Sequence, residues 1–471
     1  MTNWLPDLNE GGGPLYMRLA ERIEGDISSG VLPAGAKLPP QRDLAYDLGV
    51  TIGTVGRAYA VVRERGLVSG EVGRGTFVLV REDEKKQVEI ALPPSIGGTR
   101  FSGATSGKLV MDSTSAPEVG QNAAIERVVQ AVAREFPAEV IDYTRSVPAR
   151  WREAGSRWLS VSGWVPDAAG VVPTIGVHAA VMAVVGAVTA PGDKIAFETL
   201  TYSSIARSVN VIGRRTVLFA TDQHGPVPED FERLCAQQHP KLAFLIPTLH
   251  NPTLTVMPES RRRAIAEIAR RYNVWLIEDS IYGAFLREQP APLSTFAPER
   301  TFHVGGLSKT VAAGIRGGWV SCPANTAGRV QVAHKMVTGG ISFLLAELSA
   351  RMVLSGDADA IRDTVRDEIA ARHAMVRRTL DGFDFCSNAH CPFIWLKLPE
   401  PWLSGTFKAA AANEGVMIDD EDEYKPGRSD EVHHRVRVGF SSLPKRDAVD
   451  RGLGILRRLL ENAGAGYDTY G

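Results

Sequence analysis

Apolar residues near the start of the chain recur every three or four positions, the spacing of one face of a helix. The first such stripe lies within 16–29, and Gly30 ends it. A second stripe begins after Pro40, and a third follows Thr51, whose hydroxyl suits the N-terminal cap of a helix. Two short strand-like runs follow, 67–69 and 76–80. Three helices and a hairpin predict a winged helix-turn-helix, and a small helical packing domain is the alternative.

From residue 109 onward, short apolar runs alternate with amphipathic stretches. The runs expected to be strands are 171–174, 194–198, 216–219, 242–247, 274–278 and 301–304. This alternation favours an α/β domain with a mostly parallel central sheet, in which sites gather at the carboxyl ends of strands. A smaller α+β part, from about 343 to 471, is expected to end in a strand over 435–440 and a helix over 447–460.

The composition between these regions changes to a charged run and then to Pro, Gly, Ser and Thr, which predicts a flexible linker. With 471 residues, of which 44% are hydrophobic, the chain is long enough for more than one core. We therefore expect a DNA-binding domain over 13–80, a linker over 81–108 and a larger domain over 109–471.

Over residues 1–80, eight basic side chains stand against nine acidic ones, and this net charge of −1 argues against strong non-specific binding to nucleic acid. Between 49 and 78, however, four arginines outnumber two glutamates, so positive charge gathers on the third helix and the wing. The four cysteines form no CxxC pair, which predicts no metal site. No secretory signal or membrane span is expected, because the weakly polar stretch 176–190 is too short for a bilayer and is expected to be a buried helix. A cytoplasmic protein is the expectation.

Reactive side chains follow several of the expected strands. Lys309 comes after an apolar strand and a Gly-Gly turn, and a protected pocket suits a lysine that forms an imine. Asp279 closes another apolar strand, where a buried carboxylate needs a cationic or hydrogen-bonding group. Taken singly, Lys309 could lie on the surface, Asp279 could cap a helix, and Asn251-Pro252 could form a simple turn.

The N-terminal region resembles the GntR-type winged helix. The similarity rests on LPPQRDLAYDLGV, TVGRAY and GLVSGEVGRGTFV, and it covers about 13–80. It implies contacts with DNA from Arg42, Thr51, Thr54, Arg57, Arg74, Gly75 and Thr76. Ile52 and Gly53 depart from the polar or basic residues that many relatives carry, which bears on the operator sequence.

The second region resembles the site of fold type I aminotransferases, which bind pyridoxal 5′-phosphate. Asn251-Pro252-Thr253, Asp279-x-x-Tyr282, Ser308-Lys309 and Arg316 carry the similarity, which covers about 109–460. It implies that Lys309 forms the aldimine with the cofactor, and that Asp279 keeps the ring nitrogen protonated. The other implied cofactor contacts are Asn251 and Tyr282 to the ring hydroxyl, Tyr202 to the ring face, Gly176, Val177, Ser308 and Arg316 to the phosphate, and Tyr143 from a second subunit.

The same resemblance assigns the carboxylate of a substrate or effector to Arg437, with Arg435 as the rival. Gly306 and Leu254 depart from the aminotransferase pattern, and so does the segment around Tyr143, which leaves efficient transamination open. The acidic segment 419–423 is expected to be a solvated loop rather than a selector for a cationic amine.

Together the two regions resemble the MocR subfamily of GntR regulators. This resemblance implies a homodimeric transcriptional regulator that binds operator DNA and senses an amine, an amino acid or pyridoxal phosphate itself through Lys309. The alternatives are an active aminotransferase with an added DNA-binding domain, and an inactive scaffold for dimerisation. The intact Lys309, Asp279 and Arg316 argue against the scaffold.

Overall fold

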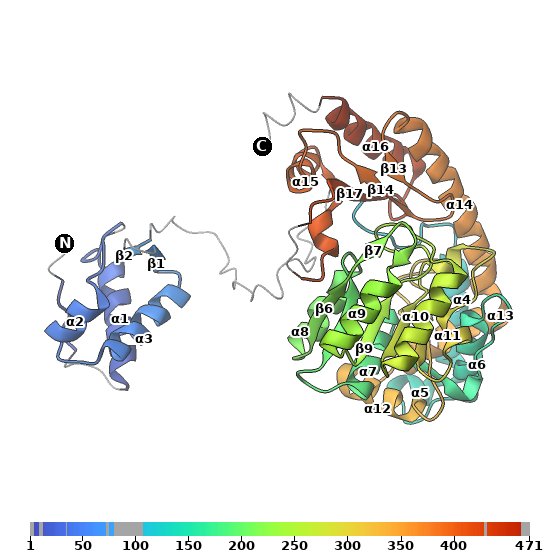
Figure 1. Cartoon of the computed structure of the whole chain (residues 1–471), viewed down its shortest axis with the longest axis horizontal. Coiled ribbons are helices and arrows are strands. Elements are labelled where there is room, and N and C mark those ends of the chain that lie inside the picture. Colours follow the sequence, from blue (N-terminus) through green and yellow to red (C-terminus); the bar gives the residue numbers. More distant parts are fainter. Residues whose placement is uncertain are drawn as a thin grey trace. The chain divides into compact units, whose positions relative to one another are not determined.

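The computed structural model describes the following residues of the chain: 4–8, 13–33, 35–71, 75–79, 107–427 and 431–462. By its internal contacts the chain divides into two compact units, residues 1–91 and 92–471. Figure 1 shows the helices and strands of both units.

The first unit contains three helices followed by a two-stranded antiparallel sheet. Its elements are α1 (Leu15–Ser28), α2 (Gln41–Asp47), α3 (Ile52–Glu64), β1 (Val68–Glu71) and β2 (Gly75–Val78). Leu19 and Ile23 of α1 and Val55, Tyr59 and Val62 of α3 are almost fully buried in one core. The helical stripes predicted from the sequence therefore face one another, and the order of elements is that of a winged helix-turn-helix.

The second unit is built on a seven-stranded sheet with the order β4-β12-β11-β10-β9-β5-β6. Its strands are β4 (Val171–Thr174), β5 (Lys194–Glu198), β6 (Arg215–Phe219), β9 (Leu242–Leu245), β10 (Trp275–Asp279), β11 (Thr301–Gly306) and β12 (Gly318–Ser321). The pairings are parallel except those of β12, which runs antiparallel to both β11 and β4. The expected α/β class with a mostly parallel sheet is confirmed.

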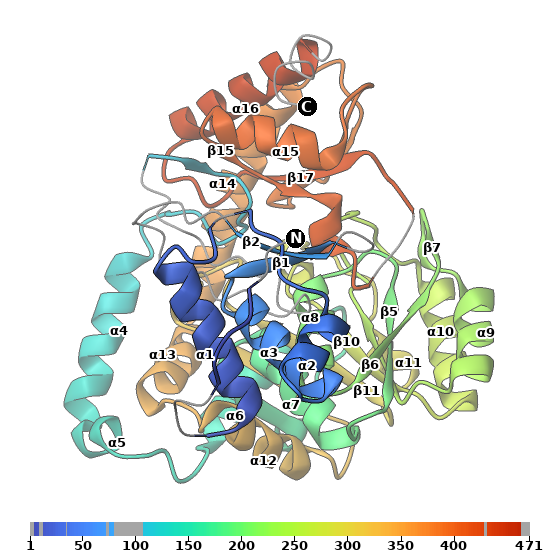
Figure 2. The same ribbon diagram turned by 90° about the vertical axis from the view of Figure 1, so that its left-hand side faces the viewer.

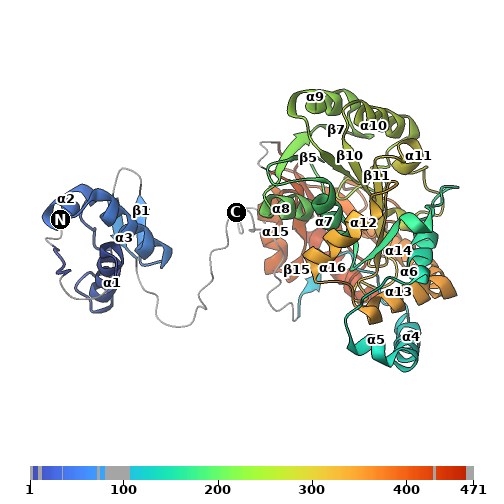
Figure 3. The ribbon, with the colours of Figure 1, turned by 90° about the horizontal axis from the view of Figure 1, so that it is seen from below.

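Helices cover both faces of this sheet, as Figure 3 shows. The first face packs against α7 (Val177–Val188), α8 (Ser203–Val211) and α12 (Ala327–Thr338), and the second against α9 (Pro228–Gln238), α10 (Glu259–Arg271) and α11 (Leu293–Phe296). Successive residues of β9 belong to the cores on opposite faces of the sheet. Phe244 lies in the core with α7, and Ala243 and Leu245 lie in the core with α10. Because both faces are buried, the strands read as continuous apolar runs.

Further helices surround the sheet and lead into the C-terminal part. They are α4 (Asn122–Glu135), α5 (Pro137–Ile141), α6 (Ala149–Leu159), α13 (Phe343–Ser355) and α14 (Asp357–Thr379). Short elements complete the connections: η1 (Ala168–Gly170), β7 (Thr221–Asp222), β8 (Gly225–Pro226), η2 (Gly283–Phe285) and η3 (Glu421–Tyr424). No helix in the part of the chain that the structure describes is long and apolar enough to cross a membrane.

The C-terminal part contains a four-stranded sheet with the order β13-β14-β17-β16. Its elements are β13 (Phe385–Cys386), β14 (Phe393–Lys397), α15 (Ser404–Asn413), β16 (Asp419–Asp420), β17 (Arg435–Gly439) and α16 (Arg446–Glu461), and α15 and α16 lie side by side in Figure 2. A separate parallel pair joins β3 (Leu109–Val110) to β15 (Val416–Met417). The first strand of the second unit is thus paired with a strand from its C-terminal part.

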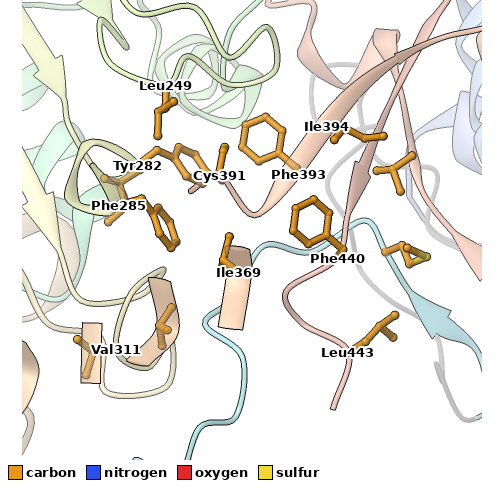
Figure 4. Packing of buried hydrophobic residues seen from close by; sticks show 14 of the residues in the cluster. Leu249, Tyr282, Phe285, Val311, Ile369, Cys391, Phe393, Ile394, Phe440 and Leu443 are labelled. Atoms are coloured by element: carbon orange, nitrogen blue, oxygen red, sulfur yellow. The ribbon is translucent and has the colours of Figure 1, made fainter. Parts of the chain in front are cut away.

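One apolar cluster joins the loops of the large sheet to the small sheet. Tyr282 and Phe285, just after β10, lie against Phe393 of β14, and the ring centroids of Tyr282 and Phe393 are 5.2 Å apart. Figure 4 shows these side chains together with Phe440 and Leu443, which follow β17. This packing brings β17 to the carboxyl end of β10.

Candidate cofactor and ligand site

A cavity of about 430 Å³ lies at the carboxyl ends of the central strands. Its lining residues come from loops that are far apart in the sequence: Ser113, Thr114, Val177, His178, Tyr202, Ser204, Ile205, Ile246, Asn251, Asp279, Ile281, Tyr282, Ser308, Lys309, Arg316, Glu423, Tyr424 and Arg437. Most residues assigned by resemblance to the cofactor therefore line one cavity. Among the described residues, no group of three or more His, Cys, Asp or Glu side chains is placed to hold a metal ion.

Asp279 ends β10 and is 3% exposed. Its Oδ1 accepts a hydrogen bond of 3.0 Å from the backbone N–H of Ile281. Burial raises the pKa of Asp279 to about 6, against the opposing effects of that hydrogen bond, His303 and Lys309. A protonated ring nitrogen would supply the cationic donor that this carboxylate needs, so Asp279 fits the pyridine ring of the cofactor.

Lys309 follows β11 and lines the cavity beside Tyr282, with its Nζ 6.0 Å from the centre of the Tyr282 ring. The Tyr282 hydroxyl lies 2.7 Å from the hydroxyl of Thr114, and burial raises the pKa of Tyr282 to about 12. Tyr282 therefore stays protonated at neutral pH. Sequence reasoning missed Thr114, because its segment has no helical or strand periodicity to mark it.

The N-terminus of α7 forms one end of the cavity. Gly176 has φ of 99°, and a Cβ there would lie 3.3 Å from Nη2 of Arg316, so the guanidinium packs directly against this turn. Arg316 itself has φ of 53°, an uncommon conformation for a residue with a side chain. A helix N-terminus, the Arg316 guanidinium and the Ser308 hydroxyl together fit an anion such as the cofactor phosphate.

Two departures from the aminotransferase pattern have local physical reasons. A Cβ on Gly306 would lie 2.6 Å from the backbone oxygen of Gly317, so the close approach of β11 and β12 leaves no room for a side chain. Leu254 has φ of 63°, in the left-handed region that glycine adopts without strain. The backbone thus keeps the turn that a glycine would make.

Arg437, on β17, lies in the cavity and is 3% exposed. Its Nη1 donates to Oδ1 of Asn251 at 3.0 Å, and its Nη2 donates to Oδ2 of Asp419 at 2.7 Å and to the backbone oxygen of Asp112 at 2.6 Å. The rival Arg435 does not line this cavity and donates to the backbone oxygen of Trp395. Of the two arginines, Arg437 is therefore the one that lines the cavity.

The acidic segment 419–423 is not a solvated loop, so that expectation was wrong. Asp419 and Glu421 are each 2% exposed, and Glu423 pairs with Arg207 and with Lys408. Lys425 also pairs with Glu421. Asp419 and Glu421 are buried because ion pairs and hydrogen bonds from Tyr424 and from backbone N–H groups compensate their negative charge, whereas Asp422 is exposed.

Tyr202 and Tyr143 lie in different places. Tyr202 lines the cavity next to His178, a second cavity residue that the sequence did not single out, and their ring centroids are 6.4 Å apart. Burial, with a smaller effect of Arg316, lowers the pKa of His178. Tyr143 is 87% exposed and lines a different surface cavity, so it reaches no Lys309 pocket within its own subunit.

In the first unit, the residues expected to meet DNA lie at the start of α2, on α3 and in the wing. Thr51 caps α3 by accepting from the N–H of Thr54 at 3.2 Å, and the two hydroxyls are 2.9 Å apart. Arg42 and Arg57 are exposed, and the Arg57 guanidinium lies 5.9 Å from the centre of the Tyr16 ring.

Gly75 is the first residue of β2, the second strand of the hairpin. Gly75 has φ of 120°, and a Cβ there would lie 2.5 Å from Cε of Lys37. Thr76 is half-buried, and Arg74 lies outside the described residues. Ile52, which stands where many relatives carry a polar or basic residue, lies in the first turn of α3 and is 52% exposed.

The fold and the cavity define the second unit as an aminotransferase-type domain with a site that fits pyridoxal phosphate. Residues 114–453 match the family described as aminotransferase class I and II, and residues 15–78 match the bacterial regulatory proteins of the gntR family. The chain belongs to the class I and II aminotransferase family and carries an N-terminal GntR helix-turn-helix, which implies DNA binding.

Two similar proteins are described as HTH-type transcriptional regulators. The chain is 29% identical over 470 residues to the uncharacterized HTH-type transcriptional regulator YdeF of Bacillus subtilis, covering 98% of this chain and 97% of the relative. It is 24% identical over 373 residues to the HTH-type pyridoxine biosynthesis transcriptional regulator PdxR of Corynebacterium glutamicum, covering 77% and 78%. The chain is thus a GntR-type regulator fused to an aminotransferase-like domain, as in the MocR subfamily.

Among solved structures, the α-aminoadipate aminotransferase LysN of Thermus thermophilus has a TM-score of 0.69 at 19% identity, covering 80% of this chain and 98% of that one. At this identity the likeness shows the fold alone.

Proposed function

We propose that this protein is a transcriptional regulator that binds pyridoxal phosphate at Lys309 and senses an amine or amino acid, or the cofactor itself, in that pocket. The observation that carries the proposal is that Lys309, Asp279, Asn251 and Arg316 line one cavity in a chain that also has a winged helix. When bound, the cofactor supplies an aldehyde that bonds covalently to amines and a ring that draws electrons from them.

The residues assigned to the cofactor have separate roles in this proposal. Asp279 would hold the proton on the ring nitrogen, and Asn251 and Tyr282 would bind the ring hydroxyl. Tyr202 would cover the ring face. The phosphate would be bound by Gly176, Val177, Ser308 and Arg316. Lys309 would hold the cofactor until a ligand amine takes its place.

We also propose the domain limits 13–80, 81–108 and 109–471, and a homodimer. The exposed Tyr143 supports the dimer, because it could reach a Lys309 pocket only in a second copy of the chain. In the first unit, Arg42, Thr51, Thr54, Arg57, Arg74, Gly75 and Thr76 would meet operator DNA. Because a regulator acts where the DNA is, we propose that the protein is cytoplasmic.

The cofactor claim is tested by absorbance. The full chain incubated with pyridoxal phosphate and desalted should keep a visible absorption band, and Lys309→Ala should lose it, because Lys309 is the only lysine among the described residues that line the cavity. Lys335→Ala removes an exposed lysine from α12 and is the matched control, expected to keep the band. A colourless wild-type protein, or the same band in Lys309→Ala, contradicts the proposal.

The alternative function is that of an active aminotransferase, which is favoured by the presence of Lys309 and Asp279 in one cavity. The two functions differ in the fate of the ligand, since a ligand that shifts a population must persist. For the regulator, we expect amines to change both the cofactor spectrum and DNA binding while keto acid accumulates slowly. Rapid multiple turnover with no effect of the amino acid on DNA binding would favour the enzyme.

A further inference from the structure

The arginine expected to bind a ligand carboxylate is already bound to a carboxylate of its own chain. Asp419 of β16 lies directly opposite Arg437 of β17 in the antiparallel register, and its Oδ2 is 2.7 Å from Nη2. Both side chains are almost fully buried. The Tyr424 hydroxyl donates to the same Oδ2 of Asp419 at 2.5 Å, so the carboxylate is fixed from two sides.

The geometry of the guanidinium explains why the contact with Asp419 prevents Arg437 from binding a second carboxylate in a fork. A carboxylate binds arginine in a fork either through Nη1 and Nη2 or through Nε and Nη2, so both forks use Nη2. Nη2 has two hydrogens, and in Arg437 they go to Asp419 and to the backbone oxygen of Asp112. Neither fork remains for a carboxylate from outside.

The other described residues of the cavity offer no substitute cation. Lys309 and Arg316 are assigned to the cofactor, and no further Lys or Arg is among the described residues that line the cavity. Arg207 and Lys408 lie behind Glu423, which pairs with both at 3.1 and 3.9 Å. A ligand carboxylate would therefore enter a pocket in which the positive charge is already neutralised.

A ligand carboxylate would not gain access to Arg437 by displacing Asp419, because that displacement is unfavourable. The carboxylate would leave the buried contacts with Arg437 and Tyr424, and a buried charge without a counter-charge is strongly unfavourable. The aromatic rings of Phe393 and Tyr424, 5.3 and 5.2 Å from the guanidinium carbon, hold Arg437 in place.

We propose that Asp419 takes the place of a ligand carboxylate on Arg437, so that the pocket selects primary amines without an α-carboxylate over α-amino acids. This inference rests on the proposed function, since it names the ligand class of the same site. It assigns to the buried acidic segment a role in specificity that its charge alone would not reveal.

The test compares each α-amino acid with the amine left by its decarboxylation. The full chain loaded with pyridoxal phosphate is titrated with L-phenylalanine and phenethylamine, and with L-lysine and cadaverine, and both the cofactor absorbance and the heat of binding are followed. For the wild-type protein we expect half-saturation by the amine at a concentration at least tenfold below that of the parent amino acid.

The matched variants are Asp419→Asn and Asp420→Asn. Asp419→Asn removes the charge but keeps the shape, and it should shift the ratio at least tenfold toward the amino acids. Asp420 is the neighbour that pairs with Lys408, and its variant should leave the ratio unchanged. If Asp419→Asn does not fold, the ratio of the half-saturating concentrations of amine and amino acid for the wild-type protein still tests the proposal.

Equal or tighter binding of the amino acids by the wild-type protein overturns the inference. The inference is also overturned if Asp419→Asn has the same amine-to-amino-acid ratio as the wild-type protein. A failure of the proposed function would be seen earlier and separately, as a protein that acquires no cofactor band before any ligand is added.

Discussion

At the scale of single residues, Asp279 shows how a binding site can be destabilising when it is empty. The carboxylate is buried and accepts a hydrogen bond from the backbone N–H of Ile281, and burial raises its pKa to about 6. An acid whose folded pKa lies above its unfolded pKa favours folding as the pH falls through the folded value, and it opposes folding at higher pH. The cofactor-free protein therefore bears a cost at neutral pH.

We predict that Asp279→Asn stabilises the cofactor-free protein. A shift from the unfolded value of 3.8 to about 6 corresponds to a gain of up to about 3 kcal/mol above pH 7, and the gain should vanish below about pH 4, where the wild-type carboxyl is protonated. Chemical denaturation at pH 8 and pH 4 measures the difference. The same variant should bind pyridoxal phosphate more weakly. A variant that is less stable than wild type at pH 8 would contradict this prediction.

At the scale of elements, α3 combines a fixed start with an exposed basic face. Thr51 caps the helix through the N–H of Thr54, which orients the first turn. Arg57 lies two turns along, exposed beside Tyr16. The helix is thus held by its cap and its buried stripe, and Arg57 is exposed, as a contact with DNA would require.

We predict that Arg57→Ala weakens binding to the DNA fragment upstream of the protein's own gene. The expected loss is about 1–3 kcal/mol if Arg57 contacts bases, or a smaller dependence on salt if it contacts phosphate. Fluorescence anisotropy at several salt concentrations measures both. Arg63→Ala removes the same charge near the end of α3 and should have the smaller effect. Equal affinities and salt slopes for wild type and Arg57→Ala would remove the assignment.

At the scale of the whole molecule, the two units have separate apolar cores. The core of the first unit is formed by its three helices and its hairpin, and the cores of the second lie around its own sheets. Separate cores unfold as separate cooperative units when few contacts join them.

We predict two transitions in calorimetry of the full chain. Pyridoxal phosphate at a hundred times its Kd should stabilise only the unit that binds it, by about 2.7 kcal/mol. The transition of the winged helix should keep its midpoint, and operator DNA should raise that midpoint instead. A single transition shifted by both ligands would show that the units unfold together.

Much of this architecture could be predicted from the sequence. The strand that ends at Asp279 and the helix after Gly176 were expected within one or two residues of their observed bounds, because buried strands and helices carry strong periodicity. The antiparallel strand β12 was not expected, since pairing between distant segments leaves no local pattern.

The site was predictable only in part, and for a related reason. Lys309 and Asp279 stand at the ends of apolar runs, which marks them. Thr114 and His178 have no such mark, and the partner of Arg437 could not be deduced from an acidic run that reads as a solvated loop. Its burial depends on the register of β16 and β17, which only the folded chain defines.

The segment that begins the second unit is fastened at the ligand pocket. Leu109 and Val110 pair with β15, the backbone oxygen of Asp112 accepts from Arg437, and the Thr114 hydroxyl meets Tyr282. Residues 109–114 are thus held by contacts with β15 and with two residues of the cavity. The start of the described part of the second unit is therefore held at the proposed ligand pocket, and a ligand that displaced Arg437 or Tyr282 would strain the contacts of Asp112 and Thr114 directly, without passing through any helix.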